Sequence, residues 1–136
     1  MAGLIERLDK TAHYLKERVG FTPEIAVILG SGLGKLADHI EESMVIPYEE
    51  IPNFPRTTVI GHEGKLIFGT VRNRKVVAMK GRFHYYEGND MDAVVFPVRV
   101  FKRMGIENIF ITNAAGGINT GFKPGDLMLI ADHISF

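Results

Sequence analysis

Two segments of the sequence carry residue types that can hold an anion. The first, 30–34, reads Gly-Ser-Gly-Leu-Gly and lies between an apolar run and a helix-like stretch. Glycines let backbone N–H groups approach a ligand, and a helix N-terminus adds partial positive charge, so Ser31 and its neighbours favour an anion. A dinucleotide fingerprint starting at Gly30 would need glycine at position 35, where Lys35 stands, and a P-loop would need glycine at position 29. A tight turn without a ligand is the alternative interpretation.

The second segment, 81–88, follows another apolar run. If it is extended, Arg82, His84 and Tyr86 lie on one face, and the alternate residues Phe83 and Glu87 lie on the other. Arg82 can hold phosphate oxygens with two hydrogen bonds, and His84 can donate to the same anion. Tyr86 can pack on a sugar or form a hydrogen bond to it. The alternative is an aromatic strand end with a solvated arginine.

Two further segments have room for a ligand. His62 stands between glycines in 61–64, where it can reach a ligand or serve as a polar turn residue. Small residues in 112–117 follow an apolar run, so they leave space for a flat molecule and expose backbone N–H groups; close packing of strand against helix is the alternative. The five histidines show no short ligand spacing and there is no cysteine, so we predict no metal site.

The elements that must position these residues follow from hydrophobic periodicity. It predicts helices at 4–19, 35–40 and 91–104, and strands at 25–29, 44–46, 65–71, 76–80, 108–112 and 127–131. Gly20 and Gly105 suit helix ends, and Asn89 or Asp90 can cap the third helix, although Pro97 argues against a straight one. Strands separated by helices predict one α/β domain over 1–136, with a mixed, largely parallel twisted sheet flanked by helices.

Composition excludes several classes of protein. Sixteen basic residues balance sixteen acidic ones, which argues against nucleic acid as a partner. No stretch approaches the roughly 20 apolar residues of a membrane span, and the N-terminus does not resemble a signal peptide. The absence of cysteine excludes a disulfide framework and fits a cytoplasmic location.

Taken together and in this order, six segments resemble purine nucleoside phosphorylases of the trimeric type that prefers 6-oxopurines. The matching segments are 29–34, 61–64, 81–88, 96–100, 112–117 and 124–134. The resemblance covers essentially the whole chain and implies the N-terminal half of that family's domain. It implies that phosphate is bound by Ser31, His62, Arg82, His84 and the backbone of Ala114. It further implies that His84 is catalytic, that Tyr86 contacts the ribose, and that Ala115 and Gly116 border the purine; Glu87 is expected to brace Arg82.

The implied reaction is glycosyl transfer by phosphorolysis. Phosphate attacks the anomeric carbon of a purine (deoxy)nucleoside, which gives free base and (deoxy)ribose 1-phosphate, with inorganic phosphate as co-substrate and no cofactor. The resemblance also implies a homo-oligomer, a trimer in the family. The family's purine-gripping residues lie beyond position 136, so we expect little or no activity from this chain alone. The alternative is a catalytically incomplete phosphate- or nucleoside-binding fragment or an interaction module. An uncovered apolar face would favour self-association.

Overall fold

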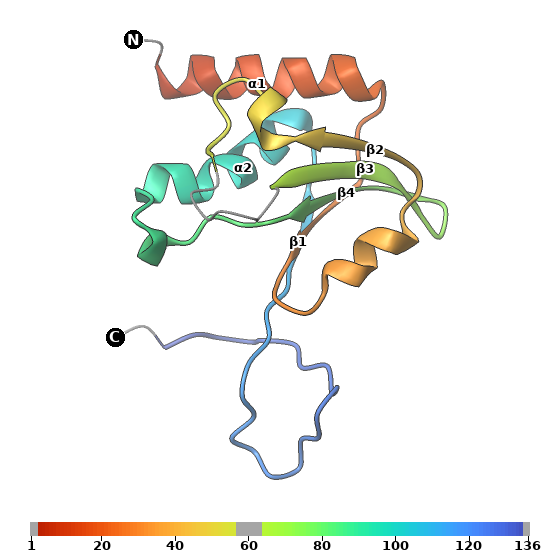
Figure 1. Ribbon diagram of the computed structural model, residues 1–136, viewed down its shortest axis with the longest axis vertical. Helices are drawn as coiled ribbons and strands as arrows, with labels where there is room; N and C mark the ends of the chain where they lie inside the picture. Colours follow the sequence, from red (N-terminus) through yellow and green to blue (C-terminus); the bar gives the residue numbers. More distant parts are fainter. Residues whose placement is uncertain (1–2, 57–63, 135–136) are drawn as a thin grey trace.

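A computed structural model of the chain describes residues 3–56 and 64–134. Its elements in chain order are α1 (Leu4–Val19), β1 (Ile25–Leu29), η1 (Gly34–His39), β2 (Glu41–Pro47), η2 (Tyr48–Glu50), β3 (Lys65–Val71), β4 (Arg74–Lys80), η3 (Tyr85–Glu87), α2 (Met91–Met104) and β5 (Asn108–Ile111), where η marks a short 3₁₀ turn. Five strands form one sheet in the order β2-β3-β4-β1-β5. Figure 1 shows this sheet with α1 and α2 on one side.

The sheet is mixed, which confirms the predicted fold class. β1 pairs in parallel with both β4 and β5, whereas β3 pairs antiparallel with both β2 and β4. Parallel strands end at the same edge of a sheet, so the loops after β1, β4 and β5 emerge together. The antiparallel β3 begins at that edge, where Lys65 pairs with Lys80. This edge therefore gathers the segments that carry the predicted ligand residues.

Helices α1 and α2 cover one face of the sheet as their apolar periodicity predicts. Their buried side chains join those of the strands in one core; from the helices these are Leu8, Ala12, Leu15, Val19, Phe96, Val100, Phe101 and Met104. Gly20 ends α1 with φ of +75°, and Gly105 ends α2 with φ of +94°. Asp90 caps α2 by accepting a 2.7 Å hydrogen bond from the backbone N–H of Ala93.

Proline 97 lies inside α2 without ending it. A proline within a helix removes one backbone hydrogen bond and costs about 3 kcal/mol. Phe96, Pro97 and Val100 are all buried against the core. The apolar contacts of this helix face offset that cost, and α2 continues to Met104.

Several predicted elements differ from the observed ones. The stretch predicted as a helix at 35–40 is the 3₁₀ turn η1, and β2 is a seven-residue strand where a shorter one was predicted. The strand predicted at 108–112 forms as β5, but it is an exposed edge strand. No strand forms at 127–131, and Leu127 and Leu129 are 98% and 95% exposed. The chain after β5 runs away from the sheet (Figure 1), so these apolar residues have no neighbouring strand to pair with.

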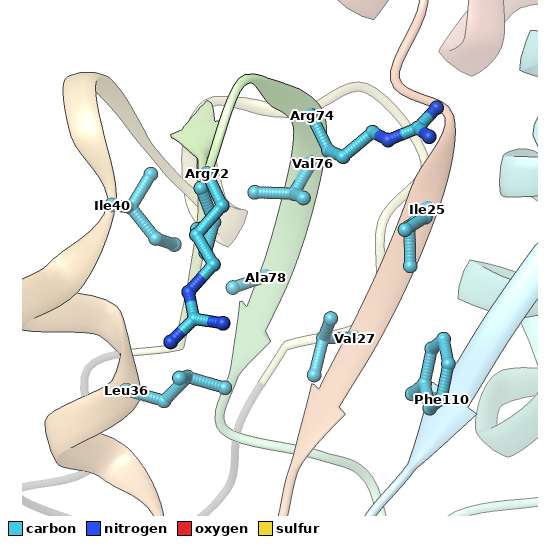
Figure 2. A pocket seen from close by; sticks show the side chains of 10 residues that line it. Ile25, Val27, Leu36, Ile40, Arg72, Arg74, Val76, Ala78 and Phe110 are labelled. Atoms are coloured by element: carbon cyan, nitrogen blue, oxygen red, sulfur yellow. The ribbon is translucent and has the colours of Figure 1, made fainter.

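The second face of the sheet is covered mainly by η1. Beside η1 lies an apolar hollow of about 290 Å³, and Figure 2 shows its lining from β1, β4, β5 and η1. The lining residues are Ile25, Val27, Leu36, Ile40, Val71, Arg72, Arg74, Val76, Ala78 and Phe110. Apart from Arg72 and Arg74, every residue in this set is apolar, so the walls of the hollow are mainly apolar. We call it the open-face hollow. Within 3–56 and 64–134, no helix has the length and apolarity that crossing a membrane requires.

Candidate active site

Residue Thr112 joins the loop after β1 to the loop after β5. Its Oγ1 accepts a 2.9 Å hydrogen bond from the backbone N–H of Gly30 and donates one of 2.9 Å to the carbonyl of Ile28. The backbone N–H of Thr112 donates to the same carbonyl at 3.1 Å. A Cβ on Gly30 would lie 2.4 Å from the Thr112 carbonyl oxygen, so only glycine fits at position 30. The two predicted ligand loops are therefore in direct backbone contact.

The loop after β1 is a tight turn that presents Ser31. The N–H of Leu33 donates to the Gly30 carbonyl at 3.2 Å, and Gly32 has φ of +81°, which favours glycine at the third turn position. Ser31 is exposed at the second position. Because η1 is a 3₁₀ turn of six residues, the positive end of a long helix dipole is missing here. An anion at this loop would be held by backbone and side-chain donors.

The guanidinium of Arg82 points at Thr112, where the loop after β5 begins. Its Nη1 donates to the Thr112 carbonyl at 3.1 Å, and its Nε donates to His84 Nε2 at 2.8 Å. Two of its five N–H groups are used in these contacts, and the others remain for an anion. The predicted adjacency of Arg82 and His84 is therefore observed, and the Gly30–Ser31 turn reaches Arg82 through Thr112.

Tyrosine 86 and Glu87 both contact His84, from different directions. The Tyr86 ring stacks on the imidazole with centroids 4.7 Å apart, as expected for residues sharing one face. Glu87 was predicted on the opposite face, but its Oε1 lies 2.8 Å from His84 Nδ1. The reason is the 3₁₀ turn η3, in which residues three apart lie on the same side. Glu87 thus contacts His84, which in turn accepts a hydrogen bond from Arg82.

A buried aromatic cluster anchors the strand end that carries Arg82. Phe83 packs against Tyr48 and Phe54 with ring centroids 5.4 and 6.2 Å apart. The Tyr48 hydroxyl donates a hydrogen bond to the Gly81 carbonyl. Burial raises the pKa of Tyr48 far above its ordinary value of 10.0, so the phenol stays a neutral donor. The residue before Arg82 is thereby fixed to the core.

Glycine 64 is the described end of the segment predicted to carry His62. A Cβ on Gly81 would lie 3.2 Å from the Gly64 Cα, and the Tyr48 N–H donates to the Gly64 carbonyl at 3.0 Å. The start of β3 therefore lies against the backbone that leads to Arg82. His62 itself falls outside the described residues.

The predicted purine side is more open than the phosphate side. Ala114, Ala115 and Gly116 are all exposed, and a Cβ on Gly116 would have no neighbour within 4 Å. Asn113 Nδ2 donates to the Ala114 carbonyl at 3.3 Å, a local contact within the loop. Ala114 follows Thr112 by two residues, but no hydrogen bond joins it to Arg82 or His84 among the described residues. Of the predicted residues, Arg82, His84 and Tyr86 thus contact one another in turn, and Ser31 follows Gly30, whose N–H is bonded to Thr112.

Sequence reasoning did not assign roles to Thr112, Tyr48 or Lys80. The Thr112 signal was present, since a hydroxyl residue directly after a strand can bond to the neighbouring loop. Tyr48 lies more than thirty residues from Gly81, so no local pattern links them. Lys80 ends β4, and its Cε lies 3.6 Å from where a Gly34 Cβ would be, which brings a cation under the 30–34 turn. In the described part of the chain, no three histidine or carboxylate residues are grouped to hold a metal ion.

Comparison with known proteins agrees with this arrangement. Residues 24–136 match the family described as the phosphorylase superfamily. The chain is 56% identical over 128 residues to purine nucleoside phosphorylase 1 of Geobacillus stearothermophilus, covering 94% of this chain and 47% of that protein. It is 51% identical over 130 residues to the Mus musculus purine nucleoside phosphorylase, covering 96% and 45%. The chain therefore spans about half the length of the curated relatives it matches.

Solved structures give the same result. A purine nucleoside phosphorylase in complex with ribose-1-phosphate superposes with a TM-score of 0.85 at 50% identity, covering 93% of this chain and 47% of that one. The Schistosoma mansoni enzyme in complex with inosine superposes with a TM-score of 0.82 at 51% identity, covering 90% and 42%. The resemblance predicted from the sequence is confirmed: the chain belongs to the phosphorylase superfamily, and it is similar over nearly its whole length to purine nucleoside phosphorylases.

Proposed function

We propose that this chain supplies the phosphate site and part of the ribose site of an enzyme that phosphorolyses purine (deoxy)nucleosides. The observation that carries the proposal is the convergence of Arg82, His84 and the Gly30–Ser31 turn around Thr112 at one edge of the sheet. Similar proteins have been solved with ribose-1-phosphate, inosine and hypoxanthine, which are the expected product, substrate and base of this reaction.

The proposed chemistry needs little from the protein beyond positioning and charge. Phosphate is already an anion, so one of its oxygens can attack C1′ as the bond from C1′ to the purine nitrogen breaks. Fixing the reactants in line can supply several kcal/mol, up to about 7–11 in well-oriented systems. Arg82 would hold the phosphate oxygens, and Tyr86, which is 81% exposed and stacks on His84, would cover the ribose.

The first test is phosphate binding measured by calorimetry on the 136-residue chain. Removing charge-assisted hydrogen bonds costs roughly 1.5–3 kcal/mol, so we expect Arg82→Ala to weaken phosphate binding about 10- to 100-fold. The matched control is Arg99→Ala, because Arg99 is an exposed arginine whose ion-pair partner is Asp92 on α2. Equal phosphate affinity in wild type and Arg82→Ala would overturn the proposed site.

A second candidate is a module that binds phosphate but does not turn over nucleosides. The exposure of Ala115 and Gly116 favours it, because the described residues offer the purine no enclosing group. Titrating inosine and phosphate separately distinguishes the two. We expect phosphate to bind, and inosine phosphorolysis by this chain alone to be absent or very slow. Turnover at an ordinary enzymatic rate of about 10 s⁻¹ would reject the module.

Other features of the whole enzyme stay predictions. We propose inorganic phosphate as co-substrate with no cofactor, a cytoplasmic location, and a homo-oligomer, with the trimer as the form the family resemblance implies. The open-face hollow and the exposed apolar residues after β5 support association of this chain with other protein surface.

A further inference from the structure

Three side chains form a continuous chain of hydrogen bonds at the site. Glu87 Oε1 lies 2.8 Å from His84 Nδ1, and His84 Nε2 lies 2.8 Å from Arg82 Nε. An ionised carboxylate can only accept hydrogen bonds, and a guanidinium can only donate them. The proton between Glu87 and His84 therefore sits on Nδ1, while Nε2 accepts from Arg82. Both contacts require the same neutral tautomer of His84.

The backbone around η3 holds Glu87 in this position. Glu87 Oε2 accepts from the backbone N–H of His84 at 3.4 Å and from Asn89 Nδ2 at 3.5 Å. Asn89 Nδ2 also donates to the His84 carbonyl at 3.0 Å. The side chains of His84 and Glu87 are 26% and 20% exposed, so the pair is largely shielded from water. The carboxylate is tied at both oxygens, which fixes its direction toward the ring.

This geometry changes the role open to His84. With Nδ1–H committed to Glu87, the neutral ring offers only the Nε2 lone pair toward Arg82 and its surroundings. The sequence predicted that His84 donates to phosphate, but a neutral ring in this tautomer has no donor on that side. It can accept one hydrogen bond instead, from Arg82 or from a protonated oxygen of a ligand.

We propose that Glu87 is a positioning residue that keeps the proton of neutral His84 on Nδ1, so that Nε2 accepts the P–OH hydrogen of a bound hydrogenphosphate. In the free protein, the same Nε2 lone pair orients Arg82. The inference rests on the proposed function, since it assumes that the anion at Arg82 is phosphate. No proton is transferred in this binding step, because the P–OH hydrogen stays on phosphate and the imidazole hydrogen stays on Nδ1.

The tautomer can be measured directly by long-range ¹H–¹⁵N correlation NMR on the ¹⁵N-labelled 136-residue chain. At about pH 8, where histidine side chains are mostly neutral, the Nδ1–H and Nε2–H forms give different ring patterns. We expect His84 to show the Nδ1–H pattern, and the His84→Asn spectrum identifies its signals. The exposed pair His13–Glu17, with a 3.2 Å contact and side chains 73% and 69% exposed, is the internal control and should not show a single fixed tautomer.

Two substitutions separate positioning from a purely structural role. Glu87→Ala should release the Nδ1–H tautomer and weaken phosphate binding about three- to tenfold, the value of one net hydrogen bond. Glu87→Gln keeps a carbonyl oxygen that can accept from Nδ1–H, so it should retain the tautomer and much of the affinity. A variant Glu87→Ala that loses affinity but keeps the Nδ1–H pattern would overturn the proposal.

The comparison of phosphate with sulfate tests the acceptor itself. Sulfate has the same shape but carries no hydrogen at neutral pH, so it cannot donate to Nε2. We expect wild type to bind phosphate about three- to tenfold more tightly than sulfate, and Glu87→Ala to bring that ratio toward one. Equal binding of the two anions by wild type would overturn the acceptor role. If wild type binds neither anion, the proposed function is wrong. If wild type binds phosphate but His84 is in the Nε2–H tautomer, only the role proposed for Glu87 is wrong.

Discussion

The two faces of the sheet carry similar residues but differ in what covers them. On one face, Phe68 and Val77 are completely buried beneath α1 and α2. On the other, Val27 and Phe110 line the open-face hollow, and Phe110 is 59% exposed. Strands that are apolar on both sides are typical of sheets with two covered faces. The strand sequence therefore specifies burial on both sides, while the described chain provides α-helices for only one and the short η1 for the other.

The largest expected effect comes from deleting the same side chain on each face. Phe68→Ala should lower the free energy of unfolding by about 3–5 kcal/mol, because it leaves a cavity in the covered core. Phe110→Ala should lower it by less than about 1 kcal/mol, since that ring already contacts solvent. Urea denaturation of both variants gives the two values. Equal losses of unfolding free energy in the two variants would show that the two faces are packed alike, contrary to this expectation.

Self-association should depend on the open face. We expect concentration-dependent association of wild type in sedimentation velocity experiments, because the hollow and the outer edge of β5 leave apolar surface uncovered. Phe110→Lys should weaken association about tenfold, since a lysine on an edge strand opposes pairing. The control is Val98→Lys, which adds the same charge to a partly exposed position on α2. A monomeric wild type at all concentrations would contradict the expectation.

The smallest expected effect concerns the ion pair at the rim of the open face. Arg74 Nη1 lies 2.8 Å from Glu24 Oε2, and this hydrogen bond, with the Lys75 N–H, lowers the pKa of Glu24 from its ordinary 4.5. A lowered pKa in the folded state adds stability that is present above pH 4.5 and is lost as pH falls through the folded value.

The measurement compares urea midpoints of wild type and Glu24→Gln from neutral to acidic pH. We expect a small advantage of wild type at neutral pH that disappears in acid. Glu107→Gln, at an exposed position before β5, is the control and should show no such convergence. A difference between wild type and Glu24→Gln that stays constant with pH would argue against the pair as its source.

Local patterns predicted the covered half of the fold well. The periodicity of α1, its end at Gly20, the Asp90 cap and the strands β1, β3 and β4 all follow from residues close in sequence. The strand predicted at 127–131 did not form, because a strand needs a partner and an apolar run alone does not specify one. β5 is exposed for the same reason, because no strand of the described chain pairs with its outer edge.

The candidate site was predicted in part for similar reasons. Arg82 and His84 are two residues apart, so an extended backbone was enough to place them together, and the contact is observed. The predicted face of Glu87 was wrong, because the extended backbone assumed for 81–88 gives way to the short turn η3. In that turn, Glu87 lies on the same side as His84, three residues earlier. The links through Thr112 and Tyr48 join residues 82 and 33 positions apart, and only the folded sheet brings them together.

Glycine at position 30 sets the distance between two loops of the proposed site. Because a single added carbon would lie 2.4 Å from the Thr112 carbonyl, the spacing between the two loops is that of bare backbones in contact. Any larger residue would act as a wedge and turn the Thr112 carbonyl away from Arg82. An alanine at position 30 would thus misalign the Arg82 guanidinium without touching it. Anion binding would weaken although every donor to the anion is still present.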